Sequence, residues 1–466
     1  MQSLEKLSPN KKIHFVGIGG VGMSALAGIL LSYGYKVSGS DLNINKMTQR
    51  LKAQGAEVFL GHSPENIDAQ DLVVYSSCIK ENNPEIIKAN KKGIPVMHRA
   101  GLLGMLMEEK CAITIAGAHG KTTTTSLIAL VLKIGRYDPS FAIGADVDVL
   151  GGNAYRGEGK YFVAEADESD GSFVRLNPYY SVITNIDREH LDHYEDLNHI
   201  VRTFKKFISN TDKNGALFCC SEDENLRKAF KNYRGNLITY GFSSEAHARA
   251  FNIRLQAMQS VFECIYKGQS LGDFTLNIPG KHNILNALAA ICVGIEIGID
   301  HDSIKNALAL FTGADRRFQV KNSRSGIMIV DDYAHHPTEI KATLEAARGW
   351  NKRVVGVFQP HRYSRTKFLK KEFGSCFAYA DHLVITDIYA ANETPIDGIG
   401  AKAIYEEVKQ SGHKSVCFLP REKVKDYLIE TVKDGDILMM LGAGDIGNLA
   451  EELNQILLCQ EKLVGK

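Results

Sequence analysis

The chain has 466 residues, of which 44% are hydrophobic and 23% charged, a composition suited to roughly two to four globular domains. The formal net charge of +1 gives no electrostatic reason to expect nucleic acid or an anionic membrane as a partner. No apolar run approaches the roughly 18 residues that cross a bilayer, and the nine cysteines contain no CxxC pair. We therefore expect a cytoplasmic protein with reduced thiols, without disulfides or a zinc site.

Strand-like and helix-like stretches alternate along the chain. Three segments each open with an apolar run and a turn: KIHFVGIGG from residue 12, CAITIAGAHG from residue 111, and a third that starts near RRFQ at residue 316. This pattern predicts an α/β protein of three domains, each on a mainly parallel sheet, over residues 1–110, 111–315 and 316–466. Residues 245–278 alternate between apolar and polar, which predicts an antiparallel hairpin at the edge of the middle sheet.

A glycine-rich turn follows the first strand. Gly17, Gly19 and Gly22 form GxGxxG at the start of a helix, and Asp41 ends the next strand. This spacing is typical of a pyrophosphate on a helix N-terminus with an acidic residue on a ribose, so NAD and a UDP-sugar are both candidates, and tight packing is the alternative. Other strands of this domain end in Ser76, Ser77, His98 and Arg99, where ligands of parallel sheets gather.

The segment ITIAGAHGKTTTTS, at residues 113–126, carries the strongest functional signal. Gly117 and Gly120 let the backbone curl with its N–H groups inward, and Lys121 and Thr122 add a positive charge and a hydroxyl. This combination between a strand and a helix predicts a loop that holds nucleotide phosphates, with the hydroxyl on Mg²⁺. The first glycine of the full eight-residue P-loop is missing, which leaves the shorter GxHGKT form.

Two acidic segments follow strands of the middle domain. Closely packed carboxylates repel one another unless a cation joins them, so EADESDGSF predicts a magnesium site near the phosphate loop, with a solvated loop as the alternative. Its carboxylates are those of Glu165, Asp167, Glu168 and Asp170. The second segment, TNIDREHLDHY, contains Asn185, Asp187, His190, Asp192 and His193. Because Mg²⁺ prefers oxygen, chemistry alone favours a turn histidine over a metal ligand at His190.

The remaining signals lie in the last 190 residues or so. Asn283 opens a helix after a Pro-Gly turn, where its amide either contacts a base or caps the helix. Two strand ends carry Asp331, Asp332, Tyr333, His335 and His336, and then His361, Arg362, Tyr363 and Arg365. Two arginines three apart can fork onto a carboxylate, which predicts a small anionic substrate; a basic surface turn is the alternative. A last GxGxxG, in GAGDIG, is interpreted as a structural turn.

Taken in order, these motifs resemble those of the Mur ligases over essentially the whole chain. The motifs are GIGGVGMS, GAHGKTTTT, EADESDGSF, TNIDREHLDHY, GKHNILNALAA, RRFQ, DDYAHHPTEI, QPHRYSRT and GAGDIG. The resemblance implies a Rossmann-like domain for a UDP-sugar, a P-loop ATPase-like central domain and a Rossmann-like domain for an amino acid. It is closest to the branch that joins L-alanine to the lactyl carboxylate of UDP-N-acetylmuramate in cytoplasmic peptidoglycan precursor synthesis. That reaction uses ATP and Mg²⁺, with Mn²⁺ as a substitute, and passes through an acyl phosphate.

The resemblance also implies roles for individual residues. The ATP site would contain Gly117, Ala118, His119, Gly120, Lys121, Thr122, Thr123, Asn283 and Arg317. The metal would be held by Thr122, Glu165 and His190. The UDP-sugar site would contain Gly19, Gly20, Met23, Asp41, Ser76, His98 and Arg99. L-Alanine would lie among Tyr333, His335, His361, Arg362 and Arg365. The catalytic set would be Lys121, Glu165, His190, Arg317 and His335, with either His335 or His361 taking the proton of the amine.

Two departures and several alternatives accompany this interpretation. Ala118 stands where the family usually has threonine, and Phe204 aligns with the lysine that is carbamylated in sibling ligases. The nearest alternative is the recycling ligase that adds a whole tripeptide to the same UDP-sugar. An NAD-dependent oxidoreductase would leave GAHGKTTTT unexplained, and a non-enzymatic ATP switch would leave Lys121, Glu165 and Arg365 unexplained. We expect a monomer or a homodimer.

Overall fold

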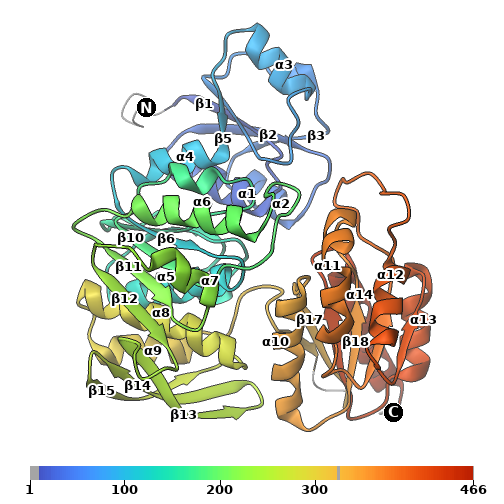
Figure 1. The fold of residues 1–466 in the computed structure, drawn as a ribbon. Coiled ribbons are helices and arrows are strands. Elements are labelled where there is room, and N and C mark those ends of the chain that lie inside the picture. The colour runs from blue at the N-terminus through green and yellow to red at the C-terminus, as the bar shows by residue number, and fades with distance from the viewer. Residues whose placement is uncertain (1–9, 323–325, 465–466) are drawn as a thin grey trace.

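The computed structural model describes residues 10–322 and 326–464, which form three sheets with helices packed on them (Figure 1). The first sheet is entirely parallel, with strand order β3-β2-β1-β4-β5. Its strands are β1 (Lys12–Val16), β2 (Lys36–Asp41), β3 (Glu57–Leu60), β4 (Leu72–Tyr75) and β5 (Val96–His98). Its helices are α1 (Val21–Ser32), α2 (Lys46–Ala53), α3 (Pro84–Lys91) and α4 (Arg99–Met107), with a 3₁₀ turn η2 (Pro64–Asn66).

The middle sheet has ten strands in the order β15-β14-β13-β12-β11-β10-β6-β9-β7-β8. The strands are β6 (Cys111–Ala116), β7 (Ser140–Ala142), β8 (Ala154–Tyr155), β9 (Tyr161–Glu165), β10 (Tyr180–Ile183), β11 (Ala216–Cys220), β12 (Leu237–Gly241), β13 (Ala248–Gln256), β14 (Gln259–Tyr266) and β15 (Gln269–Leu276). The helices are α5 (Lys121–Ile134), α6 (Leu197–Ser209), α7 (Glu224–Phe230), α8 (Lys281–Ile297) and α9 (His301–Leu310), with 3₁₀ turns η3 (Asp148–Leu150) and η4 (Ser172–Arg175). The predicted edge hairpin is a three-stranded antiparallel unit, β13 to β15.

The third sheet has the order β16-β17-β21-β18-β19-β20, antiparallel only between β16 and β17. Its strands are β16 (Gln319–Asn322), β17 (Met328–Asp332), β18 (Val354–Phe358), β19 (His382–Ile385), β20 (Val416–Phe418) and β21 (Ile437–Leu441). Its helices are α10 (Pro337–Ala347), α11 (Tyr363–Cys376), α12 (Ala401–Gln410), α13 (Arg421–Thr431) and α14 (Ile446–Val464), with a 3₁₀ turn η5 (Arg348–Trp350). The predicted α/β class with three mainly parallel sheets is confirmed.

Local sequence explains why helices form where they do, as α6 illustrates. Asp196 caps its N-terminus by accepting a hydrogen bond of 2.7 Å from the backbone N–H of His199. Ile200, Phe204 and Phe207 follow at helical spacing and are buried. Phe204 is thus a core residue, and a carbamylated side chain at this position would not fit the packing that the helix makes.

The buried apolar side chains form separate clusters, and these clusters are shared unevenly among the three sheets. One continuous cluster of buried side chains runs from Ile13 through the middle sheet to Ala314, so the first two sheets share a core. The segment after residue 315 has separate clusters on the two faces of its own sheet and stands apart as the orange and red unit of Figure 1. Polar contacts also join the first two units, including a bidentate pair between Arg50 and Asp146 at 2.7 and 3.0 Å. The third unit is therefore the one that can move with least loss of buried apolar contact.

Candidate active site

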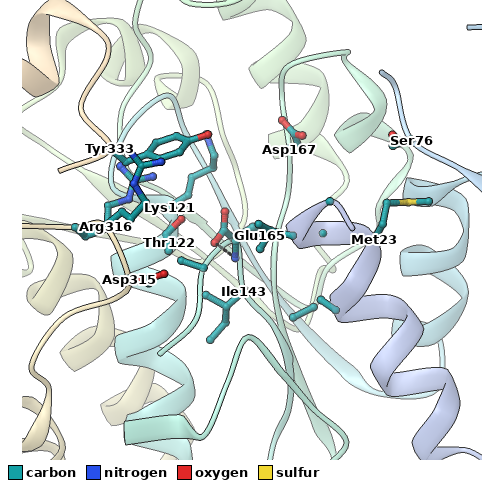
Figure 2. Close-up of a pocket in the computed structure, with 18 of the residues that line it drawn as sticks. Met23, Ser76, Lys121, Thr122, Ile143, Glu165, Asp167, Asp315, Arg316 and Tyr333 are labelled. Carbon is teal, nitrogen blue, oxygen red and sulfur yellow. Dashed lines mark hydrogen bonds between the residues drawn. The ribbon is translucent and has the colours of Figure 1, made fainter. Parts of the chain in front are cut away.

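A cavity of about 600 Å³ lies where loops from all three sheets meet. Figure 2 shows Lys121, Thr122 and Glu165 facing this space from the middle sheet, with Met23 and Ser76 on one side and Tyr333 on the other. The predicted site residues among its lining are Gly20, Met23, Ser76, Arg99, Ala118, His119, Gly120, Lys121, Thr122, Glu165, His190, Arg317, Tyr333, His335, His361, Arg362 and Arg365. Loops at the carboxyl ends of parallel strands supply most of them, as open α/β sheets do for their ligands.

The phosphate loop is a tight turn that only glycine accommodates. Gly117 and Gly120 have φ angles of +135° and +80°. A Cβ atom on Gly117 would lie 2.1 Å from Thr184 Oγ1, and one on Gly120 would lie 2.6 Å from Asn286 Oδ1. Helix α5 starts directly after this turn, so its free N–H groups and positive dipole end face the cavity. The loop is thus shaped to hold an anion.

Lys121 is held at the mouth of this loop by charge. Its Nζ donates to the backbone carbonyl of Gly117 and lies 2.7 Å from Glu168 Oε1. Burial alone would lower the pKa of Lys121, but the charges of Glu168 and Asp167 outweigh burial and raise it. The side chain is therefore a fixed positive charge beside the place where phosphates would lie.

The acidic segment after β9 is neutralised mostly by cations of the chain itself. Arg99 pairs with Asp167, and Lys121 pairs with Glu168, so cations of the chain itself join two of these carboxylates. Glu165 has no such pair among the described residues: its Oε1 accepts a hydrogen bond of 2.6 Å from the backbone N–H of Gly144. Burial raises its pKa despite that hydrogen bond. Glu165 is therefore the carboxylate that is left with capacity for a further cation.

The three predicted metal positions all line the large cavity, but they have different partners. Thr122 hydrogen-bonds to Glu165, and both offer the oxygen atoms that Mg²⁺ prefers. The Nε2 atom of His190 lies instead 3.6 Å from Glu168 Oε1. Burial alone would lower the pKa of His190, but its hydrogen bond to Glu168 raises it. In this structure the side chain of His190 is therefore a partner of Glu168.

A second cavity of about 220 Å³ adjoins the phosphate loop. Its lining includes His119, Gly120, Thr123, Asn283 and Arg317. Asn283 does not cap α8, whose N-terminal cap is Gly280, so the capping interpretation is wrong. Its Nδ2 donates 2.7 Å to the carbonyl of Pro279, and its Oδ1 accepts 3.1 Å from Asn286. One amide hydrogen and one lone pair of Asn283 therefore remain for a ligand in this cavity.

Arginine and histidine side chains line the opposite end of the large cavity. Arg365 forms a buried bidentate pair with Glu189, at 3.3 and 3.0 Å, and Arg362 lies 3.3 Å from Asp192. Burial, together with the charge of Arg365, lowers the pKa of His335 to about 4. Burial and the neighbouring His335 lower that of His361 to about 2. Both imidazoles are therefore neutral near pH 7. The cations at this end of the cavity are the two arginines, each of which has a carboxylate partner of the chain.

Several predicted residues of the first domain have structural partners instead of facing the cavity. Asp41 accepts a hydrogen bond of 2.8 Å from the backbone N–H of Gly19 and one of 3.2 Å from that of Asn43. His98 caps α4, and its Nε2 lies 3.0 Å from Ser77 Oγ. Gly19, Asp41 and His98 are consequently absent from the cavity lining described above. The expected carboxylate for a ribose is engaged in shaping the glycine turn.

Three domain profiles match the sequence: "Mur ligase family, catalytic domain" over residues 12–111, "Mur ligase middle domain" over 115–294 and "Mur ligase, glutamate ligase domain" over 316–444. A UDP-N-acetylmuramate–L-alanine ligase of Trichlorobacter lovleyi is 49% identical over 95% of this chain and 98% of that protein. One of Pelotomaculum thermopropionicum is 45% identical over 98% of this chain and 100% of that protein. The chain belongs to the Mur ligase family. The predicted family and its ligase class are confirmed.

Solved structures agree with this assignment. A UDP-N-acetylmuramate–alanine ligase of Thermotoga maritima superposes with a TM-score of 0.82 at 31% identity, covering 96% of this chain and 99% of that one. A murein peptide ligase of Psychrobacter arcticus shares the fold, with a TM-score of 0.73 at 23% identity over 96% of this chain and 99% of that one. Among the described residues of this Mur ligase, no helix combines the length and apolar character that crossing a membrane requires.

Two glutamates that contact site residues were missed by the sequence analysis. Glu339 lies 3.2 Å from His119 Nδ1, and its position three residues after His336 forms a capping box that the pattern HPTE signals. Glu189 pairs with Arg365, 176 residues away in sequence, and no local pattern marks that pairing. Both carboxylates connect the middle and third sheets of this Mur ligase.

The protonated state of His119 is expected to stabilise the protein. Burial would lower its pKa, but hydrogen bonds to Asp187, at 3.0 Å, and to Glu339 raise it to about 10, against about 6.5 in the unfolded chain. This contribution is complete below pH 6.5 and is lost as pH rises through 10, by at most about 5 kcal/mol. The urea midpoint of the wild type should therefore fall over this range more steeply than that of His119→Gln. If the urea midpoints of the wild type and of His119→Gln changed equally over this pH range, the prediction would be contradicted.

Proposed function

We propose that this Mur ligase joins L-alanine to the lactyl carboxylate of UDP-N-acetylmuramate, with conversion of ATP to ADP and phosphate. The observation that carries this proposal is the single cavity onto which a glycine turn, a phosphate loop and an arginine-rich end all open. Its three walls match a UDP-sugar, a nucleoside triphosphate and an amino acid in chemistry. The curated relatives at 45 and 49% identity carry the same activity in their names.

ATP would lie across the phosphate loop, with its base in the smaller cavity. The free amide capacity of Asn283 and the neighbouring Thr123 suit a base and its sugar. Lys121 and Arg317 would neutralise the charge that spreads over the transferring phosphoryl group. The three units that carry these parts, at residues 1–110, 111–315 and 316–466, would act as the UDP-sugar, ATP and amino-acid domains.

The oxygen atoms of Thr122 and Glu165 fit a hard dication. Glu165 is half-buried, lacks an ion-pair partner among the described residues and hydrogen-bonds to Thr122. Mg²⁺, or Mn²⁺ in its place, would supply charge neutralisation between these oxygens and the nucleotide phosphates. His190, which lies 3.6 Å from Glu168, would complete the set.

The reaction would proceed in two balanced steps. The lactyl carboxylate attacks the γ-phosphorus of ATP, which forms an acyl phosphate and releases ADP. The amine of L-alanine then attacks the acyl carbon, phosphate leaves with the bonding pair, and one proton of the amine is taken up. Neutral His335 and His361 line the same cavity and are the candidates for accepting that proton, and His335, with the higher pKa of the two, would be the stronger base. Arg362 and Arg365 would hold the carboxylate of L-alanine, with Tyr333 beside it.

The test is phosphate release from ATP and Mg²⁺ with UDP-N-acetylmuramate, comparing L-alanine with the L-Ala–D-Glu–diamino acid tripeptide. We expect release that requires both the UDP-sugar and L-alanine. Release only with the tripeptide would assign the recycling reaction, and no release with either would contradict the ligase proposal. We also propose that the enzyme is cytoplasmic and is a monomer or a homodimer. Light scattering by the same preparation measures its molar mass and so tests the oligomeric state.

A further inference from the structure

Two imidazoles and a carboxylate meet where the phosphate loop contacts the third sheet. His119 belongs to the loop, Asp187 follows β10, and His336 precedes α10. His119 Nε2 lies 3.0 Å from Asp187 Oδ2, and His336 Nδ1 lies 3.6 Å from the same oxygen. All three atoms lie within 4.8 Å of one another. Neither Asp187 nor His336 has a part in the proposed reaction.

The second nitrogen of each ring has an acceptor of its own. His119 Nδ1 lies 3.2 Å from Glu339 Oε1, and His336 Nε2 lies 3.3 Å from the backbone carbonyl of Arg188. A proton on each of these outer nitrogens leaves a lone pair on the inner nitrogen. Metal-binding histidines are oriented in this way by a carboxylate or a carbonyl on the far side of the ring. In this structure His336 Nδ1 accepts a hydrogen bond of 3.3 Å from the backbone N–H of Thr338, so a bound ion would replace that hydrogen bond. Asp187 Oδ2 accepts one of 2.7 Å from Thr338 Oγ1.

We propose that His119 Nε2, His336 Nδ1 and Asp187 Oδ2 bind a transition-metal dication of the Zn²⁺ type. Ligand atoms on a tetrahedral Zn²⁺ lie about 3.3 Å apart, so the observed separations require only small shifts of the rings. Two imidazoles with one carboxylate suit Zn²⁺ better than Mg²⁺, which favours oxygen. Binding displaces the proton that His119 shares with Asp187, and water completes the coordination.

Such an ion would tie the third sheet to the phosphate loop. His119 lines both cavities, and His336 is the N-terminal cap of α10, so the metal would bridge two units that otherwise have separate cores. The bound state would then oppose movement of the third sheet away from the phosphate loop. This inference is independent of the proposed reaction, because binding is measured without turnover.

The test is a titration of the full-length chain with Co²⁺ in saturating Mg²⁺, followed by visible absorption and then by displacement with Zn²⁺. The saturating Mg²⁺ occupies sites made of oxygen ligands, so that Co²⁺ does not fill them. The titration is made in the background of Cys78→Ser, because this substitution removes an exposed thiol that would compete for Zn²⁺. His336→Asn deletes a ligand and keeps a good helix cap, since asparagine caps helices well. Glu339→Gln removes the negative charge behind His119, and glutamine can also form the capping box of α10. His301→Gln, which removes an exposed imidazole on α9, is the matched control.

We expect one Co²⁺ per chain, with the intense bands of a low coordination number, displaced by Zn²⁺. Binding should be lost in His336→Asn, weakened about 10- to 100-fold in Glu339→Gln and unchanged in His301→Gln. Equal binding by a folded His336→Asn, or no binding by the wild type, would overturn the proposal. If His336→Asn fails to fold, unchanged affinity in Glu339→Gln would overturn it instead.

Discussion

Replacing Lys121 with methionine is expected to lower the rate of alanine-dependent phosphate release by about 10²- to 10³-fold. The substitution keeps most of the side-chain volume but removes the fixed charge beside the phosphate loop. Because that charge would act on the phosphoryl group as negative charge spreads over it, kcat should fall more than the affinity for ATP. Steady-state assays at saturating and limiting ATP separate the two effects.

A control on the same helix tests whether the loss is specific. Lys133→Met removes an exposed lysine in the last turn of α5 and should leave the rate within a factor of about two. Melting curves of both variants check that the buried Glu168, which loses its partner in Lys121→Met, does not unfold the site. Retention of more than about a tenth of the wild-type rate by Lys121→Met would contradict the proposed role.

Replacing Arg365 with methionine is expected to lower kcat/KM for L-alanine by about 10²- to 10⁴-fold, the kinetic equivalent of about 3–5 kcal/mol. Arg365 is 9% exposed and pairs with Glu189, which is 6% exposed. The substitution therefore removes a positive charge that would bind the substrate, and it leaves the buried carboxylate of Glu189 without its ion-pair partner. The KM for L-alanine should rise while that for ATP stays near its wild-type value.

The double variant Arg365→Met/Glu189→Gln separates these two causes. It removes the stranded charge and should recover thermal stability, whereas the weak use of L-alanine should persist. Arg348→Met, which breaks an exposed bidentate pair with Asp381, is the matched control and should change kcat/KM by less than about fivefold. Recovery of normal L-alanine kinetics in the double variant would show that Arg365 serves only its ion pair.

The glycine turns and the strand-helix alternation were predictable because their causes are local. A positive φ at Gly117 and Gly120, and a lysine and threonine directly after them, follow from adjacent residues. Buried parallel strands such as VVGVF, at 354–358, are apolar throughout because both faces are covered. The order of the motifs was enough to indicate the family, which the comparisons then confirmed.

The partners of the charged side chains could not be predicted from local pattern. Asp41 has the spacing of a ribose ligand yet hydrogen-bonds to Gly19. Glu189 lies in the motif TNIDREHLDHY, but nothing in that motif indicates that it pairs with Arg365. The acidic segment after β9 suggested a metal, whereas Arg99 and Lys121 neutralise two of its carboxylates. Whether a carboxylate faces a backbone amide, an arginine or an ion depends on which distant segment packs against it.

The sequence by itself therefore determined the class of fold, the family and the position of the phosphate loop, because each depends on residues close together in the chain. Only the tertiary structure decided which charges remain available to ligands. The cluster of His119, Asp187 and His336 exists because two units with separate cores meet at the phosphate loop. Its residues lie up to 217 positions apart by their numbers, 336 minus 119, so folding alone brings them within reach of one ion.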